Sequence, residues 1–414
     1  MKKNLSNLST EVRNQILKRL PLDKLPLLDK YDIKDNMSFW MYHCQPYEFP
    51  KIYSASEFRN TVLKNYEEKN KWHNLNFKHK IYNISHNRVT QIRLFEDSII
   101  TSSDDGTICL VNTDTGDFLT FEGHTSGVWC FDMINNILVS GSVDKHVIFW
   151  DLRNAWVKKK FYAHENTVRC LEISRNRAVT GGRDGVIKIW SLSKLEMLYK
   201  IEKHEASVRC LKIHKNLIVS GDYAGNICVT RLSNGSLHNY TFIDNSRIYA
   251  VDVGEEFIIC STQSGQVAIL RIFDENCKKI KLKENKIKPV VFKLTNSLIG
   301  WVFFLKKFDP EKQKLFEKYI ICGSVKGQIF ITDLNGKIVK TFNLRGSIVK
   351  LLMRNYILLV CLKDSVKIYC LKEFKFMNNL IEKGNIINAS FVENKIAVVC
   401  KISESETVVR EFRV

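Results

Sequence analysis

The chain contains an internal repeat with a period of 40 residues. Three residue types recur at fixed places in it, a histidine, an aspartate 20 residues later and a tryptophan 26 residues after the histidine. The recurring residues are His124, His164 and His204, then Asp144 and Asp184, then Trp150 and Trp190. A repeat of this length is one supersecondary unit that buries its apolar face against its neighbours, so the period predicts an array of similar units.

The residue types in the repeat narrow the array to one architecture. A period near 40 with this histidine, aspartate and tryptophan is typical of WD repeats, each a four-stranded blade of an all-β propeller. Blade one begins near Ser85, and blades two and three hold the complete pattern. Blade four has Ala224 and Thr230 in the aspartate and tryptophan places, and blade five starts at Asp244. Blades four and five are therefore predicted to have lost members of the pattern.

The period decays after Asp244, but the strand pattern continues. Three further strand-turn-strand segments predict blades six, seven and eight, namely Tyr319–Ile331, Tyr356–Tyr369 and Ile396–Phe412. Seven blades are the alternative, if the last two segments merge. The chain ends in what fits a third strand, so residues 77–84 are predicted to supply the outer strand of blade eight. This closure removes an open sheet edge.

The bulk properties exclude several classes of protein. No run of 18 apolar residues predicts a membrane span, and the polar segment Met1–Thr10 lacks the apolar core of a signal peptide. Cys130, Cys170 and Cys210 recur with the 40-residue period, as small core residues do. Reduced thiols indicate the cytoplasm or the nucleus. No metal-ligand spacing, cofactor motif or nucleophile with a paired base is evident, so neither a catalytic residue nor a cofactor is predicted.

The net charge of +19 raises the question of an anionic partner. Twelve lysines lie between positions 278 and 318, and residues 306–318 are predicted to form an insertion in blade six. A solvated lysine-rich loop is the simpler interpretation. Binding to an anionic macromolecule is the alternative.

The histidine, aspartate and tryptophan of a blade have a structural explanation. The aspartate can accept a hydrogen bond from the histidine, whose second ring nitrogen reaches Ser140 or Thr180, and that hydroxyl reaches the indole N–H. The chain of bonds ties a loop to the third strand. These histidines are therefore interpreted as structural.

The residues before the propeller do not repeat. Apolar residues at helical spacing predict an amphipathic helix that ends before Pro21, with further helices around Met37–Tyr42 and over residues 56–71. The predicted domains are a helical module over residues 1–47, a helical linker over 48–76 and the propeller over 77–414. The module is too small to bury its own apolar faces, so it either packs on the propeller or docks a helical partner.

Basic and aromatic residues occupy two recurring positions of the propeller face. The fifth residue after each repeat histidine, or its equivalent, is Trp129, Arg169, Arg209 and Tyr249, and the residue before the turn aspartate of blade three is Arg183. Arg169, Arg183 and Arg209 are expected to form one patch without matching carboxylates. A dianionic phosphate would relieve their mutual repulsion, since guanidinium groups bind phosphate in a bidentate manner.

The whole arrangement resembles the F-box/WD-repeat substrate receptors of SCF-type cullin ubiquitin ligases, closest to the branch that recognises phosphorylated degrons such as that of cyclin E. The segments LSTEVRNQILKRLPLDKL (Leu8 to Leu25) and NMSFWMYHC (Asn36 to Cys44) resemble an F-box. Ser9 stands where the family has proline, and the stretch from Leu25 to Asn36 is shorter than the family's. The family's dimerisation segment, which precedes the F-box, is not expected in this chain.

This resemblance implies roles for particular residues. The F-box residues that would bind the SCF adaptor, and through it the cullin, are Leu8, Val12, Ile16, Leu17, Leu20 and Leu25. The motifs TVRC, GGRD and SVRC match the family's phosphate-binding set, and further top-face matches are Trp129, Tyr223, Arg247 and Tyr249. The implied ligand is a phosphothreonine followed by proline.

The predicted function is therefore a non-catalytic substrate receptor with no membrane partner. The rival is a WD-repeat scaffold for anionic partners without ubiquitin function. The shortened F-box and the lysine-rich segment favour the rival, whereas the full arginine triad argues against it. Nucleic acid is not the expected partner. A third possibility is a receptor that no longer engages the adaptor.

Overall fold

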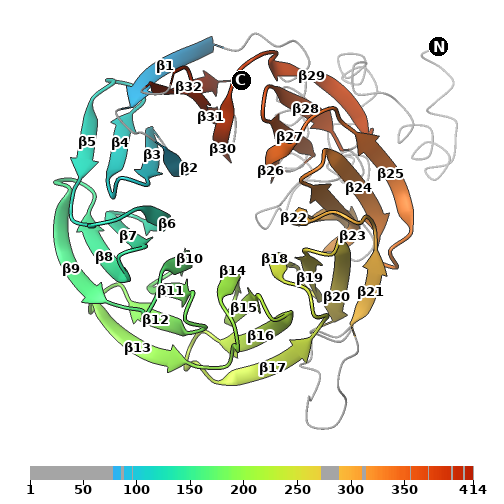
Figure 1. Cartoon of the computed structure of the whole chain (residues 1–414), viewed down its shortest axis with the longest axis horizontal. Coiled ribbons are helices and arrows are strands. Elements are labelled where there is room, and N and C mark those ends of the chain that lie inside the picture. The colour runs from blue at the N-terminus through green and yellow to red at the C-terminus, as the bar shows by residue number, and fades with distance from the viewer. Residues whose placement is uncertain are drawn as a thin grey trace, which may run out of the picture. The chain divides into compact units, whose positions relative to one another are not determined.

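The computed structural model describes residues 78–84, 88–95, 97–271, 289–309, 314–354, 356–371, 373–392, 395–403 and 406–413. These residues form eight four-stranded antiparallel sheets arranged around a central axis (Figure 1). The prediction of eight blades is confirmed, and the seven-blade alternative is wrong. The predicted helical module and linker lie outside the described residues, so those domain boundaries stay predictions. In the described part of the chain, no helix has the length and apolar character needed to cross a membrane.

The first four blades follow the order of the sequence. Blade one contains β2 (Val89–Phe95), β3 (Ser98–Ser103), β4 (Ile108–Asn112) and β5 (Phe118–Phe121). Blade two contains β6 (Val128–Ile134), β7 (Ile137–Ser142), β8 (His146–Asp151) and β9 (Trp156–Tyr162). Blade three contains β10 (Val168–Ser174), β11 (Arg177–Gly182), β12 (Ile187–Ser191) and β13 (Glu196–Ile201). Blade four contains β14 (Val208–His214), β15 (Leu217–Asp222), β16 (Asn226–Arg231) and β17 (Leu237–Phe242).

The remaining blades keep the same order until the last. Blade five contains β18 (Ile248–Val253), β19 (Phe257–Thr262), β20 (Gln266–Arg271) and β21 (Val290–Lys293). Blade six contains β22 (Ile299–Asp309), β23 (Lys314–Ser324), β24 (Gln328–Asp333) and β25 (Ile338–Asn343). Blade seven contains β26 (Ile348–Arg354), β27 (Ile357–Leu362), β28 (Val366–Cys370) and β29 (Lys375–Ile381). Blade eight contains β30 (Ile386–Val392), β31 (Lys395–Lys401), β32 (Thr407–Arg413) and β1 (Lys78–Ile84).

The predicted insertion lies in the first hairpin of blade six. β22 and β23 have 11 residues each, whereas the matching strands of the other blades have six or seven. Residues 306–309 and 314–318 therefore lengthen two paired strands.

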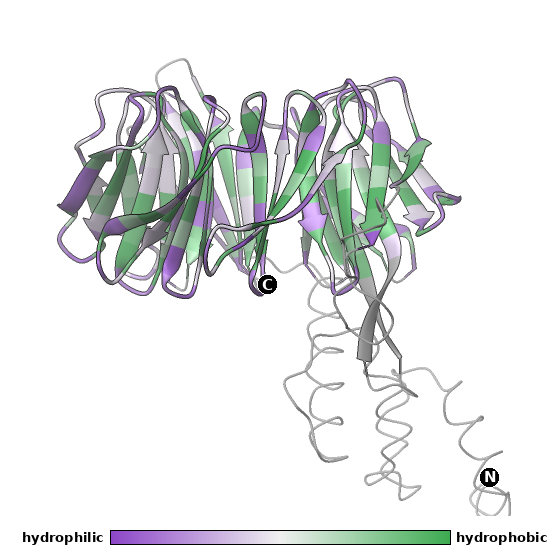
Figure 2. Cartoon of the chain, turned by 90° about the horizontal axis from the view of Figure 1, so that it is seen from below, coloured by the Kyte–Doolittle hydropathy of each residue, from purple (hydrophilic) through white to green (hydrophobic). Residues whose placement is uncertain are grey.

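The core lies between neighbouring blades. The second and third strands are buried on both faces, because each sheet is covered by the sheets beside it. The outermost strands are exposed, and hydrophilic residues gather in the loops at both ends of the strands (Figure 2). Aromatic rings join the blades, as where Phe149 and Trp190 lie 6.1 Å apart. All ten described cysteines are free, and burial raises the pKa of Cys170 to about 12, so this thiol is unreactive.

Blades two and three contain the complete hydrogen-bond chain predicted from the repeat. In blade two, His124 Nδ1 lies 2.9 Å from Asp144 Oδ2 and His124 Nε2 lies 2.8 Å from Ser140 Oγ, which accepts a 2.8 Å hydrogen bond from Trp150 Nε1. Blade three repeats this chain with Thr180 as the hydroxyl. Burial alone would raise the pKa of Asp144, but hydrogen bonds from His124 and the Thr125 N–H lower it overall. These hydrogen bonds give both histidines a structural role, in agreement with the interpretation from the sequence.

The prediction that blade four had lost its carboxylate is wrong. Ala224 occupies the usual aspartate position, but Asp222 accepts from His204 Nδ1 at 2.9 Å, and His204 Nε2 contacts Ser220 at 2.7 Å. The position of Asp222 in blade three belongs to Gly182, where a Cβ would lie 2.2 Å from Asp184 Oδ1. The two positions therefore point into one space beside the histidine, and the carboxylate comes from position 184 in blade three and from position 222 in blade four. In blade five, Asp244 replaces the histidine and accepts from Ser264 at 3.3 Å.

This exchange is testable by moving the carboxylate of blade three. Asp184→Ala is expected to lower the free energy of unfolding by about 2 kcal/mol, because His164 and two backbone N–H groups lose a charged acceptor. Gly182→Asp alone is expected to destabilise through its clashes with Asp184 and with the His164 ring. The double variant removes the first clash and should therefore be more stable than Gly182→Asp alone, as measured by chemical denaturation. Additive losses in the double variant would show that the two positions are not equivalent.

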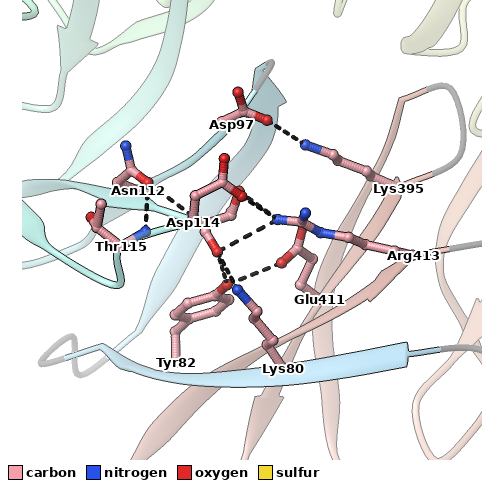
Figure 3. A network of polar contacts seen from close by, with 10 residues as sticks. Lys80, Tyr82, Asp97, Asn112, Asp114, Thr115, Lys395, Glu411 and Arg413 are labelled. Atoms are coloured by element: carbon pink, nitrogen blue, oxygen red, sulfur yellow. Dashed lines mark hydrogen bonds and ion pairs between the residues drawn. The ribbon is translucent and has the colours of Figure 1, made fainter.

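The ring is closed by contacts between the two ends of the described chain (Figure 3). Residues 77–84 were predicted to complete blade eight, and β1 does pair with β32. Tyr82 donates to Glu411 Oε2 at 3.0 Å, and Arg413 binds Glu411 Oε1 at 2.9 Å and Asp114 Oδ1 at 3.1 Å. Lys80 Nζ donates to the Thr113 carbonyl at 2.8 Å. The network joins β1, β32 and the turn after β4.

Candidate functional site

All eight blades share one backbone hydrogen bond, which identifies a common face. The N–H of a residue at the end of the second strand donates to the carbonyl just before the first strand, at 2.8–3.1 Å. The donors in blade order are Asp104, Val143, Arg183, Tyr223, Gln263, Val325, Lys363 and Lys401. We call this end of the strands the top face. Arg183 and Tyr223 therefore occupy equivalent places on it.

The inner strands carry a second recurring position on the same face. In seven blades the pairing of the first two strands skips the second residue of the inner strand, which is a β-bulge. The bulge residues in blade order are Thr90, Trp129, Arg169, Arg209, Tyr249, Val349 and Ile387. A bulge frees a side chain from the sheet and re-aims it. Polar and aromatic side chains occupy this position in blades one to five, and apolar ones in blades seven and eight.

Six residues of blades two to five form what we call the arginine–aromatic cluster. Its members are Trp129, Arg169, Arg209, Tyr223, Arg247 and Tyr249. The guanidinium carbon of Arg169 lies 5.3 Å from the centre of the Trp129 ring, and Arg169 Nη2 donates to the Tyr223 hydroxyl at 3.3 Å.

Two further arginines stack on the tyrosines of the cluster. The guanidinium of Arg247 lies 4.9 Å from the Tyr223 ring, and that of Arg209 lies 5.8 Å from the Tyr249 ring. The two tyrosine rings are 5.9 Å apart. Cation–π contacts orient guanidinium groups without neutralising them.

The charges of the cluster have no counter-ion in the described part of the chain. None of Arg169, Arg183, Arg209 and Arg247 makes an ion pair with a described residue. The Nε atoms of Arg169 and Arg209 are also buried and lack a hydrogen-bond acceptor among these residues. A buried donor without a partner costs free energy. A ligand with anionic oxygens would supply both the charge and the acceptors.

Arg183 lies on the top face beside the cluster. Its backbone N–H donates to Thr167, two residues before Arg169, and Val168 pairs with Gly182 between them. The Arg183 side chain is exposed to solvent. Trp129 and Val143 are 42% and 38% exposed, so blade two offers an apolar surface next to the arginines.

Two features of the site were not predicted from the sequence. One is the bulge, which has no residue signature of its own. The other is the pairing of each arginine with an aromatic ring. The recurrence of Trp129, Tyr223 and Tyr249 at top-face positions was the available signal for these contacts. The predicted adaptor-binding residues Leu8, Val12, Ile16, Leu17, Leu20 and Leu25 lie outside the described residues.

Eight four-stranded blades, two of which contain the complete His–Asp–hydroxyl–Trp chain, define an eight-bladed WD-repeat β-propeller. Residues 117–151 and 156–191 match the family model of the WD domain, G-beta repeat. The fold is similar to the computationally designed Ika8 protein, with a TM-score of 0.67 and 18% identity over 80% of this chain and 98% of that one.

Two curated relatives come from Schizosaccharomyces pombe (strain 972 / ATCC 24843). The chain is 44% identical over 68 residues to the WD repeat-containing protein pop2, and 36% identical over 76 residues to the WD repeat-containing protein pop1. The matches cover 16% and 18% of this chain and 10% of each relative. These matches support the assignment of WD repeats to this chain. They cover only a small part of the length of each relative.

Proposed function

We propose that this propeller is the substrate-recognition part of an SCF-type ubiquitin ligase. The arginine–aromatic cluster, together with Arg183, binds a phosphothreonine followed by proline in a degron. The N-terminal segment holds the receptor on the adaptor and cullin. The protein itself catalyses no step and accelerates ubiquitination by holding the substrate lysine near a separate conjugating enzyme.

One observation carries the phosphate-binding half of this proposal. Four guanidinium groups share one face of blades three to five without an ion pair in the described chain, and two of their Nε atoms are buried without an acceptor. Such groups repel one another and gain most from a dianion with three acceptor oxygens. A carboxylate has one charge and would leave more of the repulsion in place. The exposed Trp129 and Val143 offer an apolar surface for the proline.

The phosphate-binding half is tested by direct binding. A phosphothreonine-proline peptide should bind at least tenfold more tightly than its unphosphorylated form, as measured by calorimetry at two salt concentrations. A glutamate substitute for the phosphothreonine should bind more weakly than the phosphopeptide. Equal binding of the phosphorylated and unphosphorylated peptides would refute the proposed ligand.

The ligase half is tested separately. The full chain should co-precipitate the SCF adaptor, and a chain lacking residues 1–50 should not. A chain that binds the phosphopeptide but not the adaptor would be a phosphopeptide-binding scaffold. Steeply salt-dependent binding to nucleic acid that survives removal of the arginines would support the rival class of scaffold.

A further inference from the structure

Blades two and three present lysines to each other near the rim of the propeller, where β9 and β13 are neighbouring outer strands (Figure 1). Side chains of a strand alternate between its two faces. On β9, Lys159 is paired with Phe149, which shares a core cluster with Trp190 of blade three. Lys159 therefore faces blade three. Its ammonium group lies 5.4 Å from the centre of the Phe161 ring, and that ring lies 5.1 Å from the Trp190 ring.

Two lysines of blade three lie directly opposite each other. Lys188 on β12 is paired with Lys200 on β13 in the strand register. Lys188 lies two residues before Trp190 on the same strand, so both lysines face blade two. Like charges that are directly opposite in a sheet destabilise it. The place of Lys188 belongs to Ile148 in blade two and to Cys228 in blade four, so the lysine departs from the apolar residues of the neighbouring blades.

These cations have little compensating charge in the described part of the chain. Lys200 forms an ion pair with Glu202, whereas Lys159 and Lys188 form none with a described residue. Burial lowers the pKa of Lys188, and the charge of Lys200 lowers it further. The two effects outweigh the opposite effect of three carboxylates, which are Asp184, Glu165 and Glu202. An anionic partner would relieve the repulsion between the opposed lysines.

Blade seven accommodates a lysine at the same place in a different way. Lys367 occupies the position of Lys188, but its partner in the register is Asn379. The ammonium group of Lys367 lies 5.8 Å from the centre of the Phe376 ring. An amide and an aromatic ring thus take the place of the second cation, and the like-charge opposition of blade three is absent from this pair.

Apolar side chains lie on the same facing sides of blades two and three, toward the end of the strands opposite the top face. Trp156 is paired with Asp151, two residues after Phe149, so it faces blade three, and it is 72% exposed. Met197 is paired with Trp190, faces blade two and is 44% exposed. An indole and a flexible thioether both pack well against bulky apolar side chains.

We propose that this part of the rim binds an acidic segment of a partner protein that carries a bulky apolar side chain next to its carboxylates. We call the binding residues the rim surface, and they are Trp156, Lys159, Lys188, Met197 and Lys200. The carboxylates pair with the lysines, and the apolar side chain packs on Trp156 and Met197. The rim surface shares no residue with the arginine–aromatic cluster, so the inference goes beyond the proposed function and does not depend on it.

The surface fits an acidic peptide better than a single-stranded nucleic acid. Proteins that bind single strands use a row of aromatic platforms for the bases along a basic track for the phosphates. Met197 offers no ring on which a base can stack, and Glu202 beside Lys200 repels phosphates. Lysines are compact point charges without the bidentate geometry of arginine, so they suit carboxylates as well as phosphates.

The proposal is tested with the full chain and a panel of fluorescein-labelled peptides. Each peptide has one tryptophan or leucine and, at a spacing of one to five residues, three consecutive glutamates, and its partner peptide has glutamines instead. At least one acidic peptide should bind about tenfold more tightly than its glutamine partner, as measured by fluorescence anisotropy. Lys159→Glu and Lys188→Ile should each weaken its binding about tenfold. Lys188→Ile introduces the residue type that blade two has at this place and should fold normally.

Lys160→Glu is the matched control for Lys159→Glu. Lys160 is the next residue of β9, but it is paired with Ile148 and therefore faces blade one. The same change of net charge at this position should leave the affinity within about twofold. Equal losses of affinity in Lys159→Glu and Lys160→Glu would show a general effect of net charge and would overturn the proposal.

Further measurements locate the peptide and identify the class of ligand. In NMR spectra, the acidic peptide should shift the indole N–H signal of Trp156 and leave that of the buried Trp150 unchanged. Arg209→Ala should not change the affinity for the acidic peptide, so a failure of the phosphopeptide experiment leaves this result intact. The absence of binding by every peptide of the panel would overturn the proposal. An oligouridine that displaces the peptide and binds more weakly to Lys159→Glu and Lys188→Ile would overturn it in favour of nucleic acid.

Discussion

Replacing Arg209 with alanine is expected to weaken binding of a phosphothreonine-proline peptide roughly tenfold to a hundredfold, with Arg169→Ala similar. The same substitutions are expected to leave the free energy of unfolding unchanged or to raise it. The reason is that both guanidinium groups are held in the folded protein without a counter-ion, so their removal relieves repulsion and unpaired donors. Calorimetry and chemical denaturation of the same samples give both quantities.

A loss of affinity without a loss of stability distinguishes a ligand-binding arginine from a structural one. Truncating a structural arginine would lower the free energy of unfolding, and the protein would bind less peptide because less of it is folded. Arg153→Ala is the matched control, because Arg153 is exposed in the turn after β8, away from the top face. It should change neither quantity. The Arg209→Lys variant keeps the charge but loses the bidentate geometry. Its affinity for the phosphopeptide should therefore lie between that of the natural chain and that of Arg209→Ala.

The largest loss of stability is expected for Trp150→Ala, at about 3–5 kcal/mol. Trp150 is fully buried, packs edge-on against Phe121 at 5.7 Å and donates to Ser140. The substitution leaves a cavity and removes the donor that completes the hydrogen-bond chain of blade two. Circular dichroism during urea denaturation measures the loss.

Trp156 of the same blade is the matched control. It lies on the outer strand β9 and is 72% exposed, so Trp156→Ala is expected to change stability by less than about 1 kcal/mol. Comparable losses of unfolding free energy in Trp150→Ala and Trp156→Ala would contradict the placement of Trp150 in the core of this blade.

The sequence predicted most of the architecture because the repeat is carried by local signals. The period, the strand-turn-strand segments and the outer strand before blade one all depend on residues close together in the chain, and the structure contains them, with the outer strand as β1 (Lys78–Ile84). The carboxylate of blade four was missed for a physical reason. Positions 222 and 224 are different columns of the repeat, but the matching positions of blade three, Gly182 and Asp184, lie against each other beside His164. An alignment of the repeats compares only equivalent positions, so it does not reveal a carboxylate that has moved to a different position.

The candidate site was predictable in its residues but not in its contacts. The repeat columns indicated which side chains share a face, since blades are equivalent. The stacking of Arg247 on Tyr223, and the hydrogen bond from Arg169 to the same tyrosine, join three different blades. Those contacts depend on the spacing between sheets, which no single repeat encodes.

The closure of blade eight has a consequence for how the protein is made. Tyr82 and Glu411 are 329 residues apart in the chain, so their hydrogen bond forms only after the chain has been synthesised through β32. Until then β1 has no partner strand, and the incomplete ring exposes the edges of blades one and eight, which favour pairing with other chains. Contacts of such long sequence separation also form slowly. Chaperone binding during synthesis should therefore persist until the last strand emerges, and a nonsense mutation within β32 should yield an aggregating chain rather than a smaller propeller.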